Sequence, residues 1–322
     1  MRAVVCHELG PVENLRVEEL PTPDPVPGTV RIRVEAAGAS FVDALQVAGR
    51  YQFASKPPYT PGGEAAGVVD AVGEGVTDIV VGDRVLASTF TGAWADTLIA
   101  KPHQLYRIPA TLDAARAATF LQVYGTAWFA FTRRTQVNAG ETVLVTGAGG
   151  GVGLAAIDVA RSFGARVIAV ASTEEKRSLA LRAGADAAIA SDDDVKSRSR
   201  ELTDGQGIDV VYDVTGGDVA EQALRALRFD GRYVVIGFTA GIPRIPLNLV
   251  LLNNRTVVGV EWGGWVQRNP QTNQVLVNEV IDAIGAGRLS PIAPFVRPLT
   301  DAAEVCSELL TRRAVGKIAF VP

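Results

Sequence analysis

The residues best spaced for chemistry form a glycine-rich turn, Gly147–Gly153, between two apolar stretches. Val143–Thr146 before it has the pattern of a buried strand, an amphipathic helix follows to about Phe163, and Arg166–Ala171 is a second apolar strand. A helix that starts at such a turn presents free N–H groups and the positive end of its dipole to an anion. This order predicts a binding site for a dinucleotide pyrophosphate, although Ala148 replaces the first glycine of the usual G-x-G-x-x-G pattern.

The residues of this turn have different expected tasks. Gly150 and Gly151 let the backbone come close to the phosphates, and Val152 belongs to the same pyrophosphate-binding segment. Gly153 lets the helix pack closely on the strand.

The end of the second strand indicates which dinucleotide binds. NAD-binding folds place an acidic residue there to bond the ribose 2′-hydroxyl, whereas this chain has Ala171-Ser172, followed by Lys176 and Arg177. A carboxylate would repel a 2′-phosphate and these cations attract it, so the sequence favours NADPH over NADH. The alternative is that both cations only solvate a helix capped by Ser172 or Thr173.

The composition is that of an ordinary globular chain of 322 residues, long enough for two domains, with 48% hydrophobic and 20% charged residues. A net charge of −4 gives no electrostatic footprint for nucleic acid or an anionic membrane. The uncharged run Thr142–Ile157 is too short to span a bilayer, and the amino terminus lacks a signal-peptide pattern. Cys6 and Cys306 cannot form a disulfide framework, which fits a reducing compartment. We expect a cytoplasmic enzyme with neither membrane nor nucleic acid as partner.

A metal site is not expected. The only histidines are His7 and His103, and no C-x-x-C pair occurs, whereas zinc takes several N, S or O ligands. No G-x-S-x-G elbow points to a serine nucleophile either. Hydride chemistry supplied by the dinucleotide is what remains, with the protein positioning the reactants.

The order of apolar stretches predicts two domains. Short strands between Gly, Pro and Asp turns occupy the beginning, and strand and helix alternate after about Leu112. That alternation implies a parallel sheet covered by helices on both faces. We expect this nucleotide domain over residues 123–264, inserted into a β-rich domain of residues 1–122 and 265–322. The helix Asp113–Leu121 is expected just before this domain, and its own expected elements include the helix Gly125–Arg134 and a last strand, Thr256–Trp262.

Many motifs along the chain share the order and pattern of one known family. They lie at Ser40–Tyr51, Pro61–Val69, Val81–Val85, Gly125–Trp128, Gly147–Gly153, Ala171–Arg177, Val211–Gly217, Gly231–Phe238 and Arg312–Pro322. Together they resemble the zinc-free quinone oxidoreductases of the medium-chain dehydrogenase/reductase superfamily, over essentially the whole chain. The resemblance implies an α/β fold, in which a Rossmann doubly wound parallel sheet is inserted into a β-rich, GroES-like catalytic domain.

The chain departs from its zinc-dependent relatives at the positions that bind metal. Gly63 stands where they have the histidine before Glu64, and Ser40 stands near the place of a ligand cysteine. In the zinc-free group position 40 is usually asparagine, close to the nicotinamide, and serine keeps a shorter hydrogen-bonding group there. A tyrosine that helps to hold the 2′-phosphate in some relatives would fall near Ser191 and is missing.

The resemblance also implies which residues form the site. Ser172 and Lys176, together with Arg312, are left to bind the 2′-phosphate. The residues assigned to the nicotinamide end and the cofactor cleft are Thr126, Thr215, Phe238 and Trp262. Trp262 is equally compatible with a core or a dimer-interface role.

Tyr51 and Ser40 are the expected catalytic residues. Asp43, Gly49 and Tyr51 match a spacing found in enoyl reductases, in which the tyrosine lines the pocket and can donate a proton. In quinone reductases it mainly shapes the pocket, and the alternative is an aromatic ring packed at a loop end. Asp43 is expected to fix the loop through backbone hydrogen bonds rather than to act as a general acid.

The function expected is an NADPH-dependent, zinc-free reductase that passes hydride to a quinone or a similar conjugated carbonyl. The alternatives are a 2-enoyl thioester or enone reductase with Tyr51 as proton donor, and a non-catalytic NADPH-binding sensor or structural protein. Relatives usually dimerise by pairing their last nucleotide-domain strands. We therefore expect a homodimer through residues 256–262, whose apolar character suits such an edge.

Overall fold

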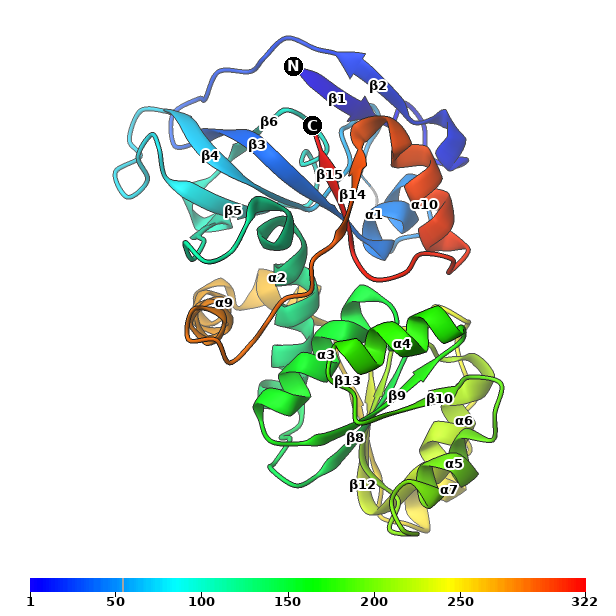
Figure 1. The fold of residues 1–322 in the computed structure, drawn as a ribbon. Coiled ribbons are helices and arrows are strands. Elements are labelled where there is room, and N and C mark those ends of the chain that lie inside the picture. The colour runs from blue at the N-terminus through cyan, green and yellow to red at the C-terminus, as the bar shows by residue number, and fades with distance from the viewer. Residues whose placement is uncertain (54) are drawn as a thin grey trace. The chain divides into compact units, whose positions relative to one another are not determined.

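The computed structural model describes residues 1–53 and 55–322, and the chain forms two compact units (Figure 1). The β-rich unit contains residues Met1–Gln122 and Ile292–Pro322, and the α/β unit contains Val123–Pro291. The first boundary lies where the sequence suggests it. The second lies at Pro291, well after the expected position 264.

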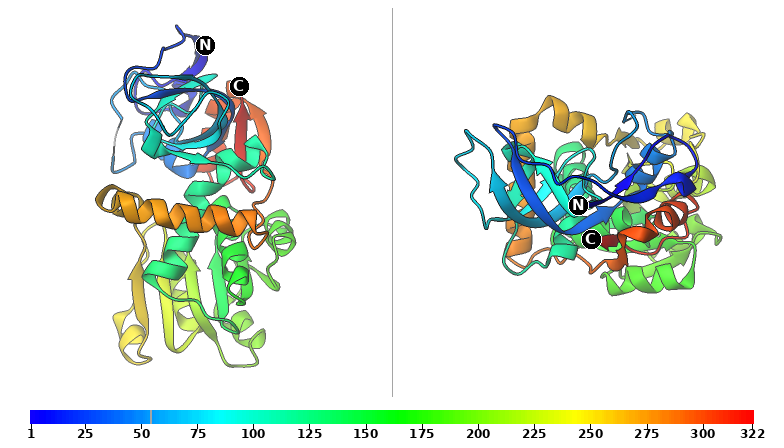
Figure 2. Two further views of the ribbon diagram at one scale, coloured as in Figure 1. Left: turned by 90° about the vertical axis from the view of Figure 1, so that its left-hand side faces the viewer. Right: turned by 90° about the horizontal axis from the view of Figure 1, so that it is seen from above.

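The β-rich unit is built on one bent sheet with the strand order β14-β15-β3-β4-β5-β7, and β6 also pairs with β3. Figure 2 shows these strands wrapping around a common core, with both chain ends close together in this unit. Its strands are β1 (Arg2–Val5), β2 (Arg16–Glu19), β3 (Val30–Ala39), β4 (Glu64–Val72), β5 (Arg84–Ser88), β6 (Thr97–Ala100), β7 (Leu105–Arg107), β14 (Phe295–Pro298) and β15 (Ile318–Val321). Its helices are α1 (Phe41–Val47), α10 (Ala302–Leu310) and the first part of α2 (Ala114–Phe129).

The core of this unit follows from strand alternation. In β3, Val30 and Ile32 are fully buried whereas Arg31 is bonded to Asp70 at 2.9 Å, so this strand has one apolar and one polar face. Trp94 is fully buried, and its indole nitrogen donates a hydrogen bond to Gly38 O at 2.8 Å.

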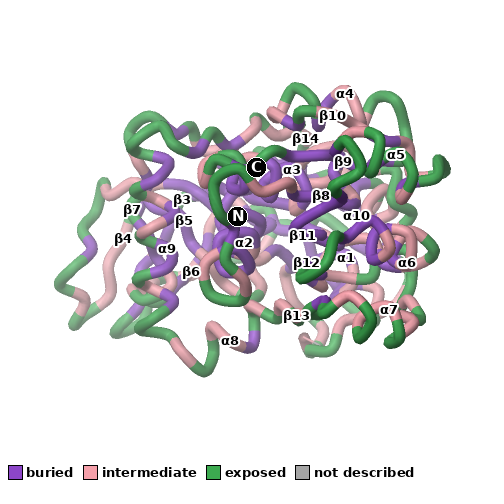
Figure 3. Tube along the Cα trace, turned by 90° about the horizontal axis from the view of Figure 1, so that it is seen from below, coloured by how far each residue is buried: buried purple, intermediate pink, exposed green. Residues whose placement is uncertain are grey.

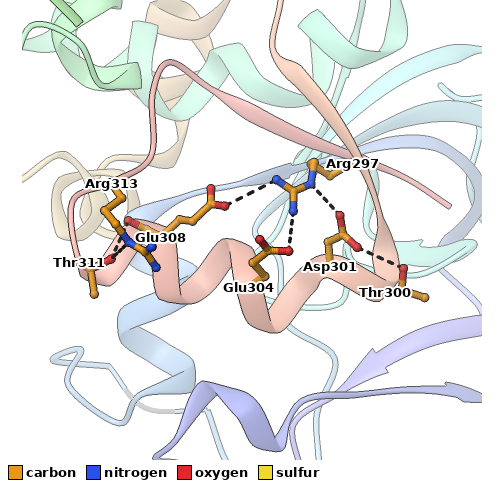
Figure 4. A network of polar contacts seen from close by, with 7 residues as sticks. All are labelled: Arg297, Thr300, Asp301, Glu304, Glu308, Thr311 and Arg313. Carbon is orange, nitrogen blue, oxygen red and sulfur yellow. Dashed lines mark hydrogen bonds and ion pairs between the residues drawn. The ribbon is translucent and has the colours of Figure 1, made fainter. Parts of the chain in front are cut away.

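A network of charged side chains fastens α10 to the strand before it (Figure 4). Arg297 of β14 donates to Asp301 at 2.6 Å and to Glu304 at 2.8 Å, and it lies 3.6 Å from Glu308. These contacts are partly exposed, so each contributes little by itself. Together they orient α10 before the chain turns into β15.

The α/β unit has a parallel sheet in the order β10-β9-β8-β11-β12-β13, with α3 and α4 on one face and α5 and α6 on the other (Figure 1). Buried segments concentrate in the central strands and exposed ones in the connections (Figure 3). Its strands are β8 (Thr142–Thr146), β9 (Arg166–Ala171), β10 (Ala187–Ala190), β11 (Ile208–Asp213), β12 (Leu227–Val235) and β13 (Thr256–Gly259). Its helices are α3 (Gly151–Ser162), α4 (Glu174–Arg182), α5 (Val195–Glu201), α6 (Gly217–Ala226), α7 (Leu247–Leu251), α8 (Trp262–Arg268), α9 (Pro270–Gly285) and the end of α2, which continues as a π-helical turn over Ala130–Arg134.

Side chains of α9 explain why the α/β unit extends beyond residue 264. Glu279 accepts a hydrogen bond from the indole of Trp128 at 2.8 Å and one from Arg133 at 2.7 Å. After α9, the backbone N–H of Ser290 donates to Asp158 of α3 at 2.7 Å. These bonds attach residues 265–291 to the α/β unit, so the expectation that they belong to the β-rich domain is wrong.

Two further expectations of element boundaries are wrong. The two helices expected on either side of residue 123 form one continuous helix, α2, because a single glycine such as Gly125 costs a helix interior only about 1 kcal/mol relative to alanine. The ring of Trp262 packs where a side chain at Gly125 would stand. The last strand ends at Gly259 rather than at Trp262. Glu261 accepts a hydrogen bond from the N–H of Gly264 at 2.7 Å and caps α8, so Trp262 is the first residue of a helix.

Candidate functional site

The glycine-rich turn follows β8 at the point where the strand order reverses, between β8 and β11. Open parallel sheets bind ligands at the carboxyl ends of the strands beside such a point. A side chain on Gly153 would place its Cβ 2.4 Å from Gly147 O, so the helix can pack this closely only with glycine there. Gly150 is the N-cap of α3 and has no side chain to occupy the first N–H groups, which are left to face an anion.

The first turn of α4 brings Lys176 to this phosphate turn. Thr173, not Ser172, is the N-cap of α4, because its hydroxyl accepts the N–H of Lys176 at 3.3 Å. Ser172 is exposed at the end of β9. Arg177 points elsewhere, since it donates to Glu174 at 2.8 Å and to Ala171 O at 3.3 Å. Of the two neighbouring cations, Lys176 is the one whose stem lies against the turn.

A buried carboxylate organises the loop after β11. Asp213 has no exposed surface, and it accepts hydrogen bonds from the hydroxyls of Thr146 and Tyr233, each at 2.5 Å. It also accepts the backbone N–H of Thr215 at 3.0 Å and that of Gly216 at 3.1 Å. The expected site residues did not include Asp213. The sequence held a signal for this buried residue, namely an acid at the end of an apolar strand.

The loops after β11 and β12 are bonded to each other and bring Thr215 and Phe238 together. The N–H of Ala240 donates to Thr215 O at 2.8 Å. A Cβ on Gly216 would lie 3.2 Å from the ring of Phe238, and one on Gly147 would lie 3.1 Å from the Thr215 hydroxyl. Thr215 and Phe238 therefore stand beside the phosphate turn, on the same edge of the sheet.

Trp262 packs against α2 within the α/β unit. A Cβ on Gly125 would lie 2.4 Å from the Trp262 ring, next to Thr126 in the sequence. The indole nitrogen donates to Asn273 of α9 at 3.2 Å. These contacts give Trp262 a packing role between α2, α8 and α9.

Ser40 is the N-cap of α1, and its hydroxyl is already engaged. It donates to Asp43 Oδ2 at 2.7 Å and accepts the N–H of Asp43 at 3.2 Å. Asp43 in turn accepts the N–H of Ser40 at 2.8 Å, so its expected role in fixing the loop is confirmed. Because the single proton of the Ser40 hydroxyl points to Asp43, this geometry does not direct it toward a substrate.

Tyr51 belongs to a small group of aromatic side chains at the end of its loop. Its ring centroid lies 6.0 Å from that of Phe53, edge to face, and 6.5 Å from that of Phe90. Phe53 is 42% exposed and Phe90 is 43% exposed, so both are large apolar side chains that remain accessible to solvent. The group provides an apolar wall suited to a flat ligand.

Two carboxyls, Asp43 and Glu64, are buried and interact with Lys317. Burial raises the pKa of Glu64 to about 7, and it raises the pKa of Asp43 while lowering that of Lys317. Lys317 opposes the rise at both carboxyls, and Glu64 accepts the N–H of Gln122 at 2.8 Å. The sequence did not reveal this cluster, because its members are far apart along the chain.

Arg312 lies in the β-rich unit, at the turn after α10, with a left-handed backbone conformation of φ 60°. Its side chain is exposed. Ser191, near the position where some relatives have a tyrosine, directly follows β10.

Within residues 1–53 and 55–322, no three or more His, Cys, Asp or Glu side chains are gathered so as to hold a metal ion. Among the same residues, no helix combines the length and apolar character needed to cross a membrane.

Comparisons with known proteins match both units. Residues 26–110 match the family model of the alcohol dehydrogenase GroES-like domain, and residues 151–281 match that of the zinc-binding dehydrogenase. The chain is 37% identical over 321 residues to quinone oxidoreductase-like protein 2 of Bos taurus, covering 98% of this chain and 91% of that protein.

Solved structures agree with this. The Escherichia coli quinone oxidoreductase complexed with NADPH superposes with a TM-score of 0.89 at 27% identity and covers 100% of both chains. The CurK enoyl reductase superposes with a TM-score of 0.88 at 26% identity, covering 99% of this chain and 98% of that one.

Proposed function

The chain belongs to the zinc-free quinone oxidoreductases of the medium-chain dehydrogenase/reductase superfamily, and we propose that it is an NADPH-dependent reductase whose acceptor is a quinone or a similar conjugated carbonyl compound. The observation that carries the acceptor is the aromatic group formed by Tyr51 and Phe53, which follow α1, and Phe90, which follows β5. The other candidate donor, Ser40, gives its proton to Asp43. Quinone reduction suits such a site, because the charge develops on oxygen and can be stabilised by one hydrogen bond or by water.

The residues around the glycine-rich turn fit NADPH. Gly153 lets the start of α3 pack directly on the backbone of Gly147. With Gly150 as its N-cap, this helix start offers the N–H groups of Gly151 and Val152 to the pyrophosphate. Ser172 and Lys176, at the end of β9 and the start of α4, would bind the 2′-phosphate. When bound, NADPH supplies the hydride.

We assign the nicotinamide end of NADPH to residues at the carboxyl edge of the parallel sheet and on α2. Thr215 and Phe238 stand at the carboxyl ends of β11 and β12 and would support the ring. Thr126 would contact it from α2, while Trp262 holds α2 in place by packing on Gly125. Asp213 is fully buried and fixes the Thr215 loop by accepting the backbone N–H of Thr215.

A second candidate function is reduction of a 2-enoyl thioester or an enone. The likeness to the CurK enoyl reductase supports it, and Tyr51 is the side chain that would protonate the carbon next to the carbonyl. Replacing Tyr51 with phenylalanine separates the two, since an enoyl reductase would lose its proton donor while a quinone reductase would keep the pocket wall.

The first experiment measures loss of NADPH absorbance with a small quinone and with a crotonyl-type thioester, with NADH in parallel. We expect faster turnover of the quinone, a preference for NADPH, and at most a severalfold change in Tyr51→Phe. Turnover of the thioester alone, abolished in Tyr51→Phe, would establish the second candidate. Binding of NADPH without turnover of either acceptor would instead indicate a non-catalytic binding protein.

We also propose a homodimer formed through β13. This strand pairs with β12 on one side, and Val257 is 41% exposed on it. An apolar edge of this kind is a template for pairing with a second chain. Three large side chains on or beside α7, just before β13 in sequence, are more than 70% exposed: Leu247, Leu251 and Leu252.

The molar mass in solution tests this interface. Val257→Lys places a charge on the edge and should convert the dimer to a monomer, whereas Val81→Lys, at a residue 62% exposed in the β-rich unit, should not. A wild-type chain that is monomeric at micromolar concentration would contradict the proposal.

A further inference from the structure

Gly149 is needed because a side chain there would collide with α4, and not because its backbone conformation requires glycine. A Cβ on Gly149 would lie 2.4 Å from Cβ of Lys176, 2.6 Å from its Cγ and 3.0 Å from its Cα. Gly147 differs, because its φ of 62° lies in the left-handed region that glycine favours. Gly150 differs too, since a Cβ there would meet only Gly147 O, at 3.5 Å.

The atoms that face Gly149 cannot move aside separately. They belong to the stem of Lys176, and the N–H of this residue is held by the Thr173 hydroxyl at 3.3 Å. The next residue, Arg177, is bonded both to Glu174 and to Ala171 O. A side chain at position 149 would therefore displace the first turn of α4 as a whole, and the Lys176 ammonium with it.

We propose that Gly149 is a specificity-determining residue, which allows α4 to approach the phosphate turn so that Lys176 reaches the 2′-phosphate of NADPH. This inference rests on the proposed use of NADPH. The pyrophosphate-binding N–H groups belong to the start of α3, on the other side of Gly149 in sequence, and a shift of α4 leaves them in place. Gly149 thus governs the affinity for NADPH relative to NADH more than the affinity for dinucleotides in general.

The test compares dissociation constants of the full-length chain for NADPH and NADH. Gly149→Ala should weaken NADPH binding about tenfold and NADH binding less than about twofold, because one charge-assisted contact is lost. Lys176→Ala should show the same selective loss, and the double variant should bind NADPH no worse than Lys176→Ala alone. Gly285→Ala is the control, since a Cβ at that position of α9 meets nothing within 4 Å.

The outcomes separate this inference from the proposed function. A wild-type chain without preference for NADPH would refute the cofactor assignment and the inference together. A wild-type preference that Lys176→Ala removes but Gly149→Ala keeps would refute the inference alone, as would an equal loss for both dinucleotides in Gly149→Ala. If Gly149→Ala does not fold, addition of Lys176→Gly should restore folding by removing the facing Cβ, and failure to do so would overturn the proposed contact.

Discussion

Replacing Asp213 with asparagine should loosen the loop that carries Thr215. All the groups around the carboxylate are donors: the hydroxyls of Thr146 and Tyr233 and the N–H groups of Thr215 and Gly216. An asparagine can offer only one oxygen, so either orientation of its amide turns an NH₂ group toward a buried hydroxyl, whose own proton then loses its acceptor. A hydrogen bond to a charged group contributes about 1.5–3 kcal/mol, and we expect Asp213→Asn to lower the free energy of unfolding by about 3 kcal/mol.

A double-mutant cycle with Tyr233→Phe identifies the bond responsible. Tyr233→Phe alone removes one hydrogen bond to the carboxylate and should cost about 1.5–3 kcal/mol. In the double variant no tyrosine proton is left without an acceptor, so the second change should cost at least about 1 kcal/mol less than it does alone. Tyr212→Phe is the matched control. The hydroxyl of Tyr212 is buried and has no hydrogen-bond partner within the described part of the chain, so its removal should cost nothing.

Hydrogen exchange of the amides of β8 and β11 in the full-length chain gives the opening free energy of the α/β unit separately. The dissociation constant for NADPH should rise in Asp213→Asn, because Thr215 is no longer held at the sheet edge. Costs of Asp213→Asn and Tyr233→Phe that add to within about 0.5 kcal/mol would refute the reasoning. So would an unchanged affinity for NADPH in a destabilised Asp213→Asn variant.

Two further predictions concern buried carboxyls. Burial raises the pKa of Glu64 from 4.5 to about 7, so its contribution to stability is full below pH 4.5 and is lost as the pH rises to about 7. Glu64→Gln should therefore gain up to about 3 kcal/mol relative to the wild type between about pH 4 and pH 8, measured by urea unfolding, and a constant difference would contradict this. The hydroxyl of Tyr124 donates to Asp158 at 2.8 Å, and Tyr124→Phe should cost about 1.5–3 kcal/mol at neutral pH. Burial raises the pKa of Asp158, so the cost should be smaller in acid, where its carboxyl gains a proton and needs the donor less. An equal cost at neutral pH and at about pH 4 would show that packing is responsible.

Local periodicity was enough to predict the elements of the α/β unit around the phosphate turn. β9 spans Arg166–Ala171 as expected, and the strand–turn–helix order before it is confirmed. These elements are determined by apolar patterns and glycines within a few residues. The break expected between Leu121 and Gly125 did not occur, because a helix tolerates one glycine, and the ring of Trp262, far along the chain, packs beside it.

The polar interior of both units was much less predictable. Asp213 and Glu64 have the residue types of surface charges, yet both are buried, and only for Asp213 did the sequence hold a local signal, an acid at the end of an apolar strand. The position of Lys317 close to Glu64 and Asp43 depends on the pairing of β15 with β3, which no local pattern specifies. For Ser40, the residue type indicated a hydrogen-bonding group, but its partner is decided by the capping geometry of α1.

The central place of β15 in its sheet has a consequence for how the protein is made. β15 lies between β14 and β3, and Lys317 beside it is 278 residues from Ala39, whose carbonyl it faces. When residue 122 has been synthesised, the roughly 200 residues that follow still take on the order of 10–40 s on the ribosome. During that time one end of β3 has no neighbour on that side, and Asp43 and Glu64 have no ammonium group beside them. The contiguous α/β unit can fold in the meantime, whereas the β-rich unit waits for the last residues, and a chain that terminates early would expose an open sheet edge to chaperones and proteases.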